Sequence, residues 1–121
     1  MSNNSISPRA GQGGDAAPVF SSMVNDPDMG DLIELFVQDL PRRVEELQGV
    51  ARVSDWDGVR RVAHQLKGAS GGYGFAIVGT CAGELEARTI RATKSRLDSD
   101  LTEVRKQIDE LISLCNRVRA H

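Results

Sequence analysis

Apolar side chains recur at alternating steps of four and three residues near the end of the chain. The positions concerned are Leu97, Leu101, Val104, Ile108, Leu111, Cys115 and Val118. This spacing gathers all of them on one face of an α-helix, whereas a strand, with its period of two, would scatter them over both faces. Such a seam must be buried by other helices, which predicts antiparallel packing in a helix bundle.

Another stretch of helical spacing begins at the acidic run NDPDM. We expect Asp26 to cap this helix, Pro27 to take its first position and Asp28 to lie in its first turn. Pro41 falls inside the stretch and is expected to kink it, because proline has no N–H to donate. The apolar positions keep their phase on both sides of Pro41, which favours one bent helix over two.

Two more helices are expected between these segments. Ser54 or Asp55 caps the first of them, which ends in the glycine run at residues 72–74, and the other covers about residues 76–91. Four helices with short connections predict an all-α fold, an antiparallel up-and-down four-helix bundle.

The N-terminal residues differ in composition from the rest. Residues 1–18 are rich in Ser, Asn, Gly and Ala and are expected to form a disordered tail. Residues 19–121 then make up one domain, in which Val19, Phe20 and Met23 form a short extra helical segment that covers one end of the core. The starting methionine and the polar lead favour a free-standing protein.

Composition narrows the function classes. The net charge of −2 gives no reason to expect binding to nucleic acid or to an anionic membrane. Cys81 and Cys115 lie in apolar helical patterns without metal-ligand spacing and are expected to be buried thiols. No apolar run reaches the roughly 18 residues that span a bilayer, and no signal pattern opens the chain. We therefore expect a cytoplasmic protein.

A histidine is expected on the exposed side of the helix that ends in the glycine run. Helical residues advance by about 100°, so His64 lies opposite the buried Leu66. Its neighbours at three and four residues are Arg60, Arg61, Lys67 and Gly68. The imidazole is therefore predicted to be exposed in a basic setting.

Glycines beside this histidine weaken the helix, at a cost of roughly 1 kcal/mol each relative to alanine. Gly68 and Gly71 clear a strip where a ligand or partner could approach the ring. Lys67 could neutralise an anion attached to the imidazole, and a phosphoryl group is the natural candidate. Imidazole is a good nucleophile near neutral pH.

The stretch AHQLKGASGGYG resembles the signature of histidine phosphotransfer (HPt) domains. The matching positions are His64, Leu66, Lys67, Gly68, Ser70 and Gly74. The resemblance extends over about residues 26–118, with LFVQDLPRRVEEL before the signature and CAGELEA after it.

This resemblance implies a phosphorelay intermediate. His64 would accept a phosphoryl group at Nε2 from a receiver-domain aspartate or a kinase and pass it to another receiver aspartate. Lys67 would stabilise the phosphoryl charge, and Gly68 would leave room for the receiver's active site to approach His64. The supporting residues would be Gln65, Ser70, Gly74 and Glu86. Glu86, 22 positions after the histidine, could hold Nδ1–H or be a solvated surface acid.

The resemblance also implies the partners. They are response-regulator receiver domains and a sensor histidine kinase, with no nucleic acid or membrane, and the chain is expected to be a monomer. It is expected to be a phosphocarrier and not an enzyme, without a cofactor of its own, because Mg²⁺ belongs to the receiver. The candidate docking residues are Arg60, Arg61, Gly71, Tyr73 and Phe75, with the Val19–Phe20 segment as a further candidate.

Three other functions fit the sequence less well. A metal or hydrolytic enzyme using His64 is disfavoured because arginines, a lysine and a glycine occupy its turn-spaced neighbours, which repel a cation. A receiver-docking or adaptor bundle without phosphotransfer would be expected to lack His64 or Lys67. The phosphoacceptor domain of a histidine kinase fits the Lys67–Gly68 pair and the glycine run poorly.

Overall fold

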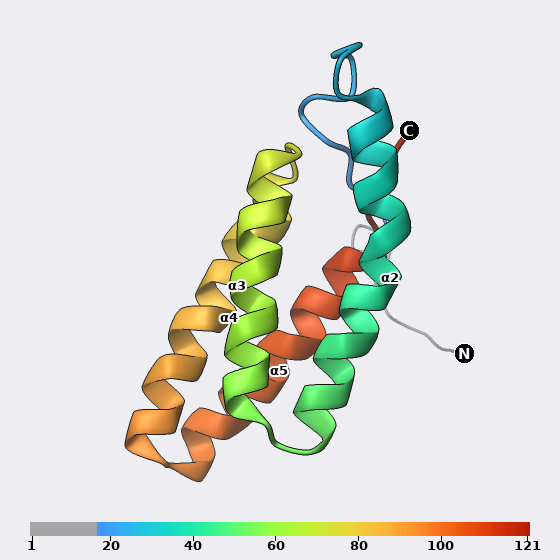
Figure 1. Ribbon diagram of the computed structural model, residues 1–121. Coiled ribbons are helices and arrows are strands. Elements are labelled where there is room, and N and C mark those ends of the chain that lie inside the picture. Colours follow the sequence, from blue (N-terminus) through green and yellow to red (C-terminus); the bar gives the residue numbers. More distant parts are fainter. Residues whose placement is uncertain (1–16) are drawn as a thin grey trace, which may run out of the picture.

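The computed structural model describes residues 17–121 and contains four helices in that range. They are α2 (Gly30–Arg52), α3 (Trp56–Gly72), α4 (Ala76–Ser95) and α5 (Asp98–Cys115). Short loops join them, so consecutive helices run antiparallel (Figure 1). The α3–α4 pair packs most extensively and the α2–α5 pair least. The predicted all-α four-helix bundle is confirmed.

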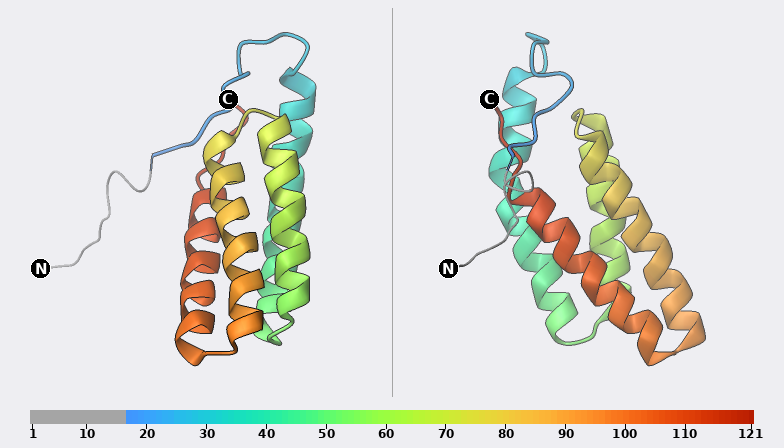
Figure 2. Two further views of the ribbon diagram at one scale, coloured as in Figure 1. Left: turned by 90° about the vertical axis from the view of Figure 1, so that its left-hand side faces the viewer. Right: turned by 180° about the vertical axis from the view of Figure 1, so that it is seen from behind.

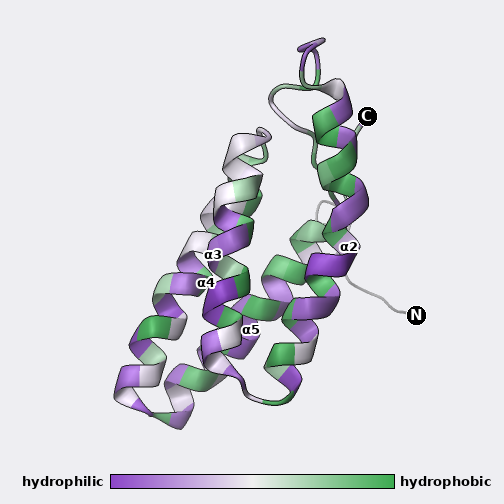
Figure 3. Cartoon of the chain, in the orientation of Figure 1, coloured by the Kyte–Doolittle hydropathy of each residue, from purple (hydrophilic) through white to green (hydrophobic). Residues whose placement is uncertain are grey.

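Each helix contributes one leucine to the centre of the bundle. Leu47, Leu66, Leu85 and Leu111 are all 0% exposed. Burying such a side chain stabilises the fold by about 1.5–3 kcal/mol. Figure 3 shows apolar and polar residues alternating along the helices, as amphipathic packing requires.

The start of α2 differs from the expectation. Asp26 does not cap the helix: its carboxylate accepts the Asp28 N–H at 2.9 Å, and its carbonyl accepts the Met29 N–H at 3.0 Å. These bonds close a turn ahead of the helix, which begins only at Gly30. The expectation of one helix and not two is confirmed, because α2 continues through Pro41.

The ends of α3 follow the sequence closely. The Asp55 carboxylate accepts the Gly58 N–H at 3.0 Å and caps the N-terminus. Beyond the C-terminus, Gly74 has a φ of +85°, and a Cβ there would overlap the Ser21 hydroxyl. Only glycine fits this turn. The next helix, α4, runs one turn further than expected, to Ser95.

The first described residues attach to the other end of the chain. Val19 and Val118 form an isolated parallel bridge, and the Val19 N–H donates to the Arg117 carbonyl at 2.8 Å. Figure 2 shows this segment running beside the C-terminus. The Ala17 carbonyl, expected to lie in the tail, accepts from Arg117 Nε at 2.7 Å. The rest of the expected tail, residues 1–16, lies outside the described residues.

The expected short helical segment is a pair of turns instead. The Val24 N–H bonds to the Ser21 carbonyl at 3.2 Å and the Asp26 N–H to the Met23 carbonyl at 3.0 Å, without continuing as a helix. The Ser21 hydroxyl donates to the Tyr73 carbonyl at 2.6 Å, which ties these turns to the end of α3. Between residues 17 and 121, no helix is long and apolar enough to cross a membrane.

Both thiols sit between helices. Cys115 on α5 is buried, and Cys81 on α4 is half-buried. Burial raises the pKa of Cys115 to about 12, and the nearby Cys81 adds to the shift. Burial also raises the pKa of Cys81, with Glu110 and Glu84 contributing. Both groups therefore favour the neutral thiol.

Candidate functional site

Close packing of α3 against α4 sets the frame of the site. A Cβ added at Gly79 of α4 would lie 3.4 Å from the Lys67 carbonyl oxygen and 3.5 Å from the Gly71 nitrogen of α3. Glycine therefore lets the two backbones approach closely. Because the helices are antiparallel, residues one or two turns later on α4 come within reach of residues one or two turns earlier on α3.

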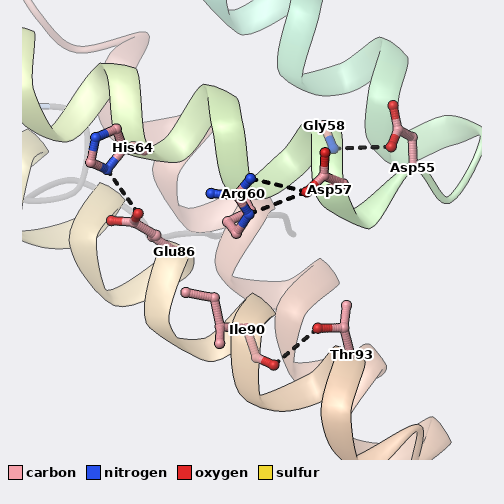
Figure 4. A network of polar contacts seen from close by, with 8 residues as sticks. All are labelled: Asp55, Asp57, Gly58, Arg60, His64, Glu86, Ile90 and Thr93. Atoms are coloured by element: carbon pink, nitrogen blue, oxygen red, sulfur yellow. Dashed lines mark hydrogen bonds and ion pairs between the residues drawn. The ribbon is translucent and has the colours of Figure 1, made fainter.

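His64 of α3 contacts Glu86 of α4. The His64 Nδ1 atom is 2.8 Å from the Glu86 Oε2 atom, and the second ring nitrogen points away from the carboxylate (Figure 4). The imidazole side chain is 67% exposed, whereas the Glu86 side chain is only 15% exposed. Glu86 is thus the imidazole's partner and not a solvated surface acid.

This contact determines the tautomer of the ring. A carboxylate accepts hydrogen bonds and has no proton to give, so the proton of this bond resides on Nδ1. In the neutral imidazole, Nε2 is then the nitrogen with a free lone pair. The geometry therefore presents Nε2 as a nucleophile on an exposed helix face.

Lys67 reaches the same carboxylate from α3. Its Nζ is 3.9 Å from the Glu86 Oε1 atom, and its side chain is 55% exposed. The two oxygens of Glu86 therefore face two different groups, the imidazole and the ammonium. The result is a cation held one turn from the histidine.

Open space surrounds the helix glycines next to His64. A Cβ added at Gly68 or Gly71 would meet nothing within 4 Å, and both residues are exposed. Internal packing therefore does not require glycine at either position. The surface beside the ring is open, as expected from the sequence.

The expected basic setting needs correction. Arg60 pairs with Asp57, with Nη2 at 3.0 Å from Oδ1, and this pair also appears in Figure 4. Arg61 pairs with Glu46 of α2, with Nη1 at 3.4 Å from Oε2. Each guanidinium carries an acidic neighbour, so the surface around His64 is a mixed-charge surface.

The expected docking role of Phe75 is wrong. Its side chain is 1% exposed and stacks on Phe36 of α2, with ring centroids 5.4 Å apart. It is a core residue that no partner can reach. Tyr73 is half-buried and also packs on Phe36, at 5.4 Å.

The remaining expected site residues divide into scaffold and surface. Ser70 is 0% exposed, and its hydroxyl has no hydrogen-bond partner within residues 17–121. Gly74 shapes the turn after α3. Gln65 is exposed on α3. Of these three residues, only Gln65 presents a side chain to solvent.

The glycines of α4 are not among the site residues that the sequence predicts. Gly79 and Gly83 precede Glu86 by seven and three residues, so all three share one face of α4. The spacing shows from the sequence alone that these residues share a face of α4. It does not show which helix packs against that face. Over the part of the chain that the structure describes, no three His, Cys, Asp or Glu side chains are grouped to hold a metal ion.

Comparison with known proteins adds one finding. A search of curated proteins gave no match, and neither did a search of solved structures. A family model described as the Hpt domain matches residues 31–121. The match spans all four helices and includes His64, Lys67 and Glu86, and because it covers well over half of the sequence, the chain belongs to the Hpt domain family.

Proposed function

We propose that this protein is a phosphorelay intermediate that carries a phosphoryl group on Nε2 of His64. Membership of the Hpt family implies histidine phosphotransfer in a phosphorelay. The contact between His64 Nδ1 and Glu86, at 2.8 Å, is the observation that supports this assignment to a particular atom. It leaves Nε2 unprotonated on an exposed ring.

The proposed transfer conserves the proton on Nδ1. The Nε2 lone pair attacks the phosphorus of a receiver's aspartyl phosphate, and the bond from phosphorus to the carboxylate oxygen breaks. The aspartate leaves as a carboxylate, while the ring gains positive charge that Glu86 faces through Nδ1–H. In the onward step another aspartate attacks phosphorus, the N–P bond breaks and neutral imidazole leaves.

Lys67 and the glycines would support this chemistry from the same face. The ammonium lies 3.9 Å from Glu86 and one turn from His64, close enough to compensate phosphoryl charge. The open surface at Gly68 and Gly71 suits the approach of a receiver's active site. Mg²⁺ would come with the receiver, and Gln65 lies at the edge of the same surface.

The partners proposed are receiver domains of response regulators and a sensor histidine kinase. The Hpt family works with such domains in two-component systems, and its members are phosphocarriers. A monomeric, cytoplasmic carrier without catalytic activity of its own remains our prediction for this chain. A receiver-docking bundle without phosphotransfer is the competing function.

A transfer assay tests the proposal. Purified receiver domains, charged with radiolabelled acetyl phosphate and Mg²⁺, are mixed with the wild-type chain, with His64→Gln and with His121→Gln. The sequence has two histidines, so His121→Gln is a matched control. We expect acid-labile label on the wild type and on His121→Gln, and none on His64→Gln.

Two results would overturn the assignment. Label on His64→Gln would place the phosphoryl group elsewhere. Receivers that bind the wild-type chain but transfer no label to it would favour the docking function. The mutant's circular dichroism spectrum should match the wild type, because an exposed side chain contributes little to folding.

A further inference from the structure

Gly83 of α4 lies beneath the side chain of Lys67. A Cβ added at Gly83 would lie 3.3 Å from Lys67 Cδ, 3.6 Å from Cε and 3.7 Å from Cγ. These three carbons are its nearest neighbours. The aliphatic stem of the lysine therefore occupies the space that any other residue at position 83 would fill.

The helix register explains why the stem lies there. Along α4 one face presents, in order, Gly79, Gly83 and Glu86. The residues that they meet on α3, in the opposite chain direction, are Gly71, Lys67 and His64. Lys67 thus sits midway between a close backbone contact and the His64–Glu86 pair, and its ammonium reaches the Glu86 Oε1 atom at 3.9 Å.

We infer that Gly83 is a positioning residue for phosphotransfer that acts through Lys67. A lysine stem in open solvent samples many rotamers, whereas contact with a flat helix surface restricts them. Gly83 supplies that flat surface and directs the ammonium along α4 toward Glu86 and the ring of His64. The inference rests on the proposed function, in which His64 carries the phosphoryl group.

Packing alone does not account for this glycine. At Gly79, the added Cβ would meet backbone atoms of α3, which cannot move aside. At Gly83, it would meet only the middle of a flexible side chain among its three nearest atoms. A substitution at Gly83 should therefore leave the fold intact and displace Lys67.

The test compares Gly83→Ala and Gly83→Leu with Gly49→Ala. Gly49 is also inside a helix, and a Cβ there would meet nothing within 4 Å, so this control reports the helix-propensity effect alone. We expect phosphohistidine to hydrolyse about two- to fivefold faster in Gly83→Ala, the range that loss of one exposed ionic contact produces. Gly83→Leu should have the larger effect, and Gly49→Ala should have none.

A readout on the free protein does not depend on phosphate. Lys67 is one of three lysines, with Lys94 and Lys106, so its ε-methylene resonance can be assigned by mutation. We expect Gly83→Ala to move this resonance and to make the methylene group more mobile, with Lys94 and Lys106 unchanged. An unmoved Lys67 resonance would overturn the inference whatever the transfer assay shows.

A double-mutant cycle completes the test. In a Lys67→Ala background, Gly83→Ala should not change the phosphohistidine lifetime further, because the residue through which it acts is gone. A full additional effect would mean that Gly83 acts by another route, and the inference would be wrong. If Lys67→Ala shortens the lifetime and Gly83→Ala does not, the proposed function stands and the inference fails; label on His64→Gln would instead refute the function.

Discussion

Nδ1 of His64 and Oε2 of Glu86 lie 2.8 Å apart, although 22 residues separate them in the sequence. The pair joins the two helices that pack most extensively in the bundle. A carboxylate at this position both fixes the tautomer and faces any positive charge that the ring acquires. An amide oxygen could accept the same hydrogen bond, but an amide carries no charge to face the ring, and its NH2 group could instead donate to Nδ1.

Substitution of Glu86 should separate these two effects. In Glu86→Gln the amide oxygen can still accept from Nδ1–H and leave Nε2 free to receive the phosphoryl group, but a neutral amide stabilises the charge of the phosphorylated ring less. In Glu86→Ala both effects are lost, and we expect phosphoryl uptake to slow by about tenfold, as for loss of a hydrogen bond to a charged group. Single-turnover uptake and the histidine ring ¹⁵N shifts measure rate and tautomer.

An unchanged rate and tautomer in Glu86→Ala would contradict this account. Glu84→Ala is a suitable control, because Glu84 is an exposed acid on the same helix and its carboxylate contacts Gln107 of α5, not His64.

Gly68→Ala should stabilise the fold while Gly68→Gln should block docking. Alanine improves helix propensity by about 0.5–1 kcal/mol, and a Cβ at Gly68 meets nothing within 4 Å. A glutamine projects from the same open surface into the path of a receiver. Urea unfolding and receiver titration by calorimetry measure the two effects.

Gly49→Gln provides the control for the glutamine variant, because it makes the same change on α2. Receiver affinity that is equal in Gly68→Gln and Gly49→Gln would remove the role of Gly68 in access.

Receiver association should depend on the ion pairs near His64. Arg60 and Arg61 are paired with Asp57 and Glu46, so the charge of this surface can be changed in either direction. We expect Arg60→Ala with Arg61→Ala to slow association with an acidic receiver by about threefold. Asp57→Asn with Glu46→Gln should accelerate it by a similar factor.

Stopped-flow association at low and high salt checks these rates. Both effects should shrink as salt rises, since exposed charges are screened. Equal rates for the two double variants at low salt would show that this surface does not steer the receiver.

Cys115 should resist alkylation in the folded protein. The pKa of its thiol is raised to about 12, chiefly by burial, so at pH 8 the reactive thiolate is scarce. Iodoacetamide should modify the half-buried Cys81 first, and both thiols should react once the protein is unfolded. Mass spectrometry of timed samples gives the order, and early labelling of Cys115 would contradict it.

The same thiol makes stability depend on pH. Its pKa in the unfolded chain is about 8.5, so between about pH 8.5 and pH 12 the folded state holds a proton that the unfolded state has lost. The free energy of unfolding should fall as pH rises through this window. Cys115→Ala should show a shallower fall in urea titrations.

The sequence predicted mainly those features that depend on residues close together along the chain. The Asp55 cap depends on neighbours along the chain, and this prediction is confirmed. The apolar seam is confirmed at Val104, Ile108, Leu111 and Cys115, which are buried on α5. Its two ends differ, because Leu97 precedes α5 and is 57% exposed, and Val118 is buried beyond the end of the helix. The start of α2 failed locally as well, because Asp26 can close a turn as readily as it can cap a helix.

Tertiary contacts account for the rest of the differences. Phe75 follows a glycine run and looked available to a partner, but it is buried because Phe36 of another helix covers it. The ion pair of Arg61 involves Glu46, 15 residues earlier on another helix. The role of Gly83 depends on the packing of α4 against α3, which places the Lys67 side chain over this glycine. The spacing of residues along one helix does not show which residues of a neighbouring helix pack against it.

The bridge between Val19 and Val118 brings the two ends of the described chain together. A linker of about six residues would span the offset between residue 121 and residue 17, at about 3.3 Å per residue. The chain could then be reopened in the loop between α4 and α5, at Arg96 and Leu97. Such a circular permutant would keep α3 and α4 contiguous, so the contact between His64 and Glu86 would survive the change in chain order.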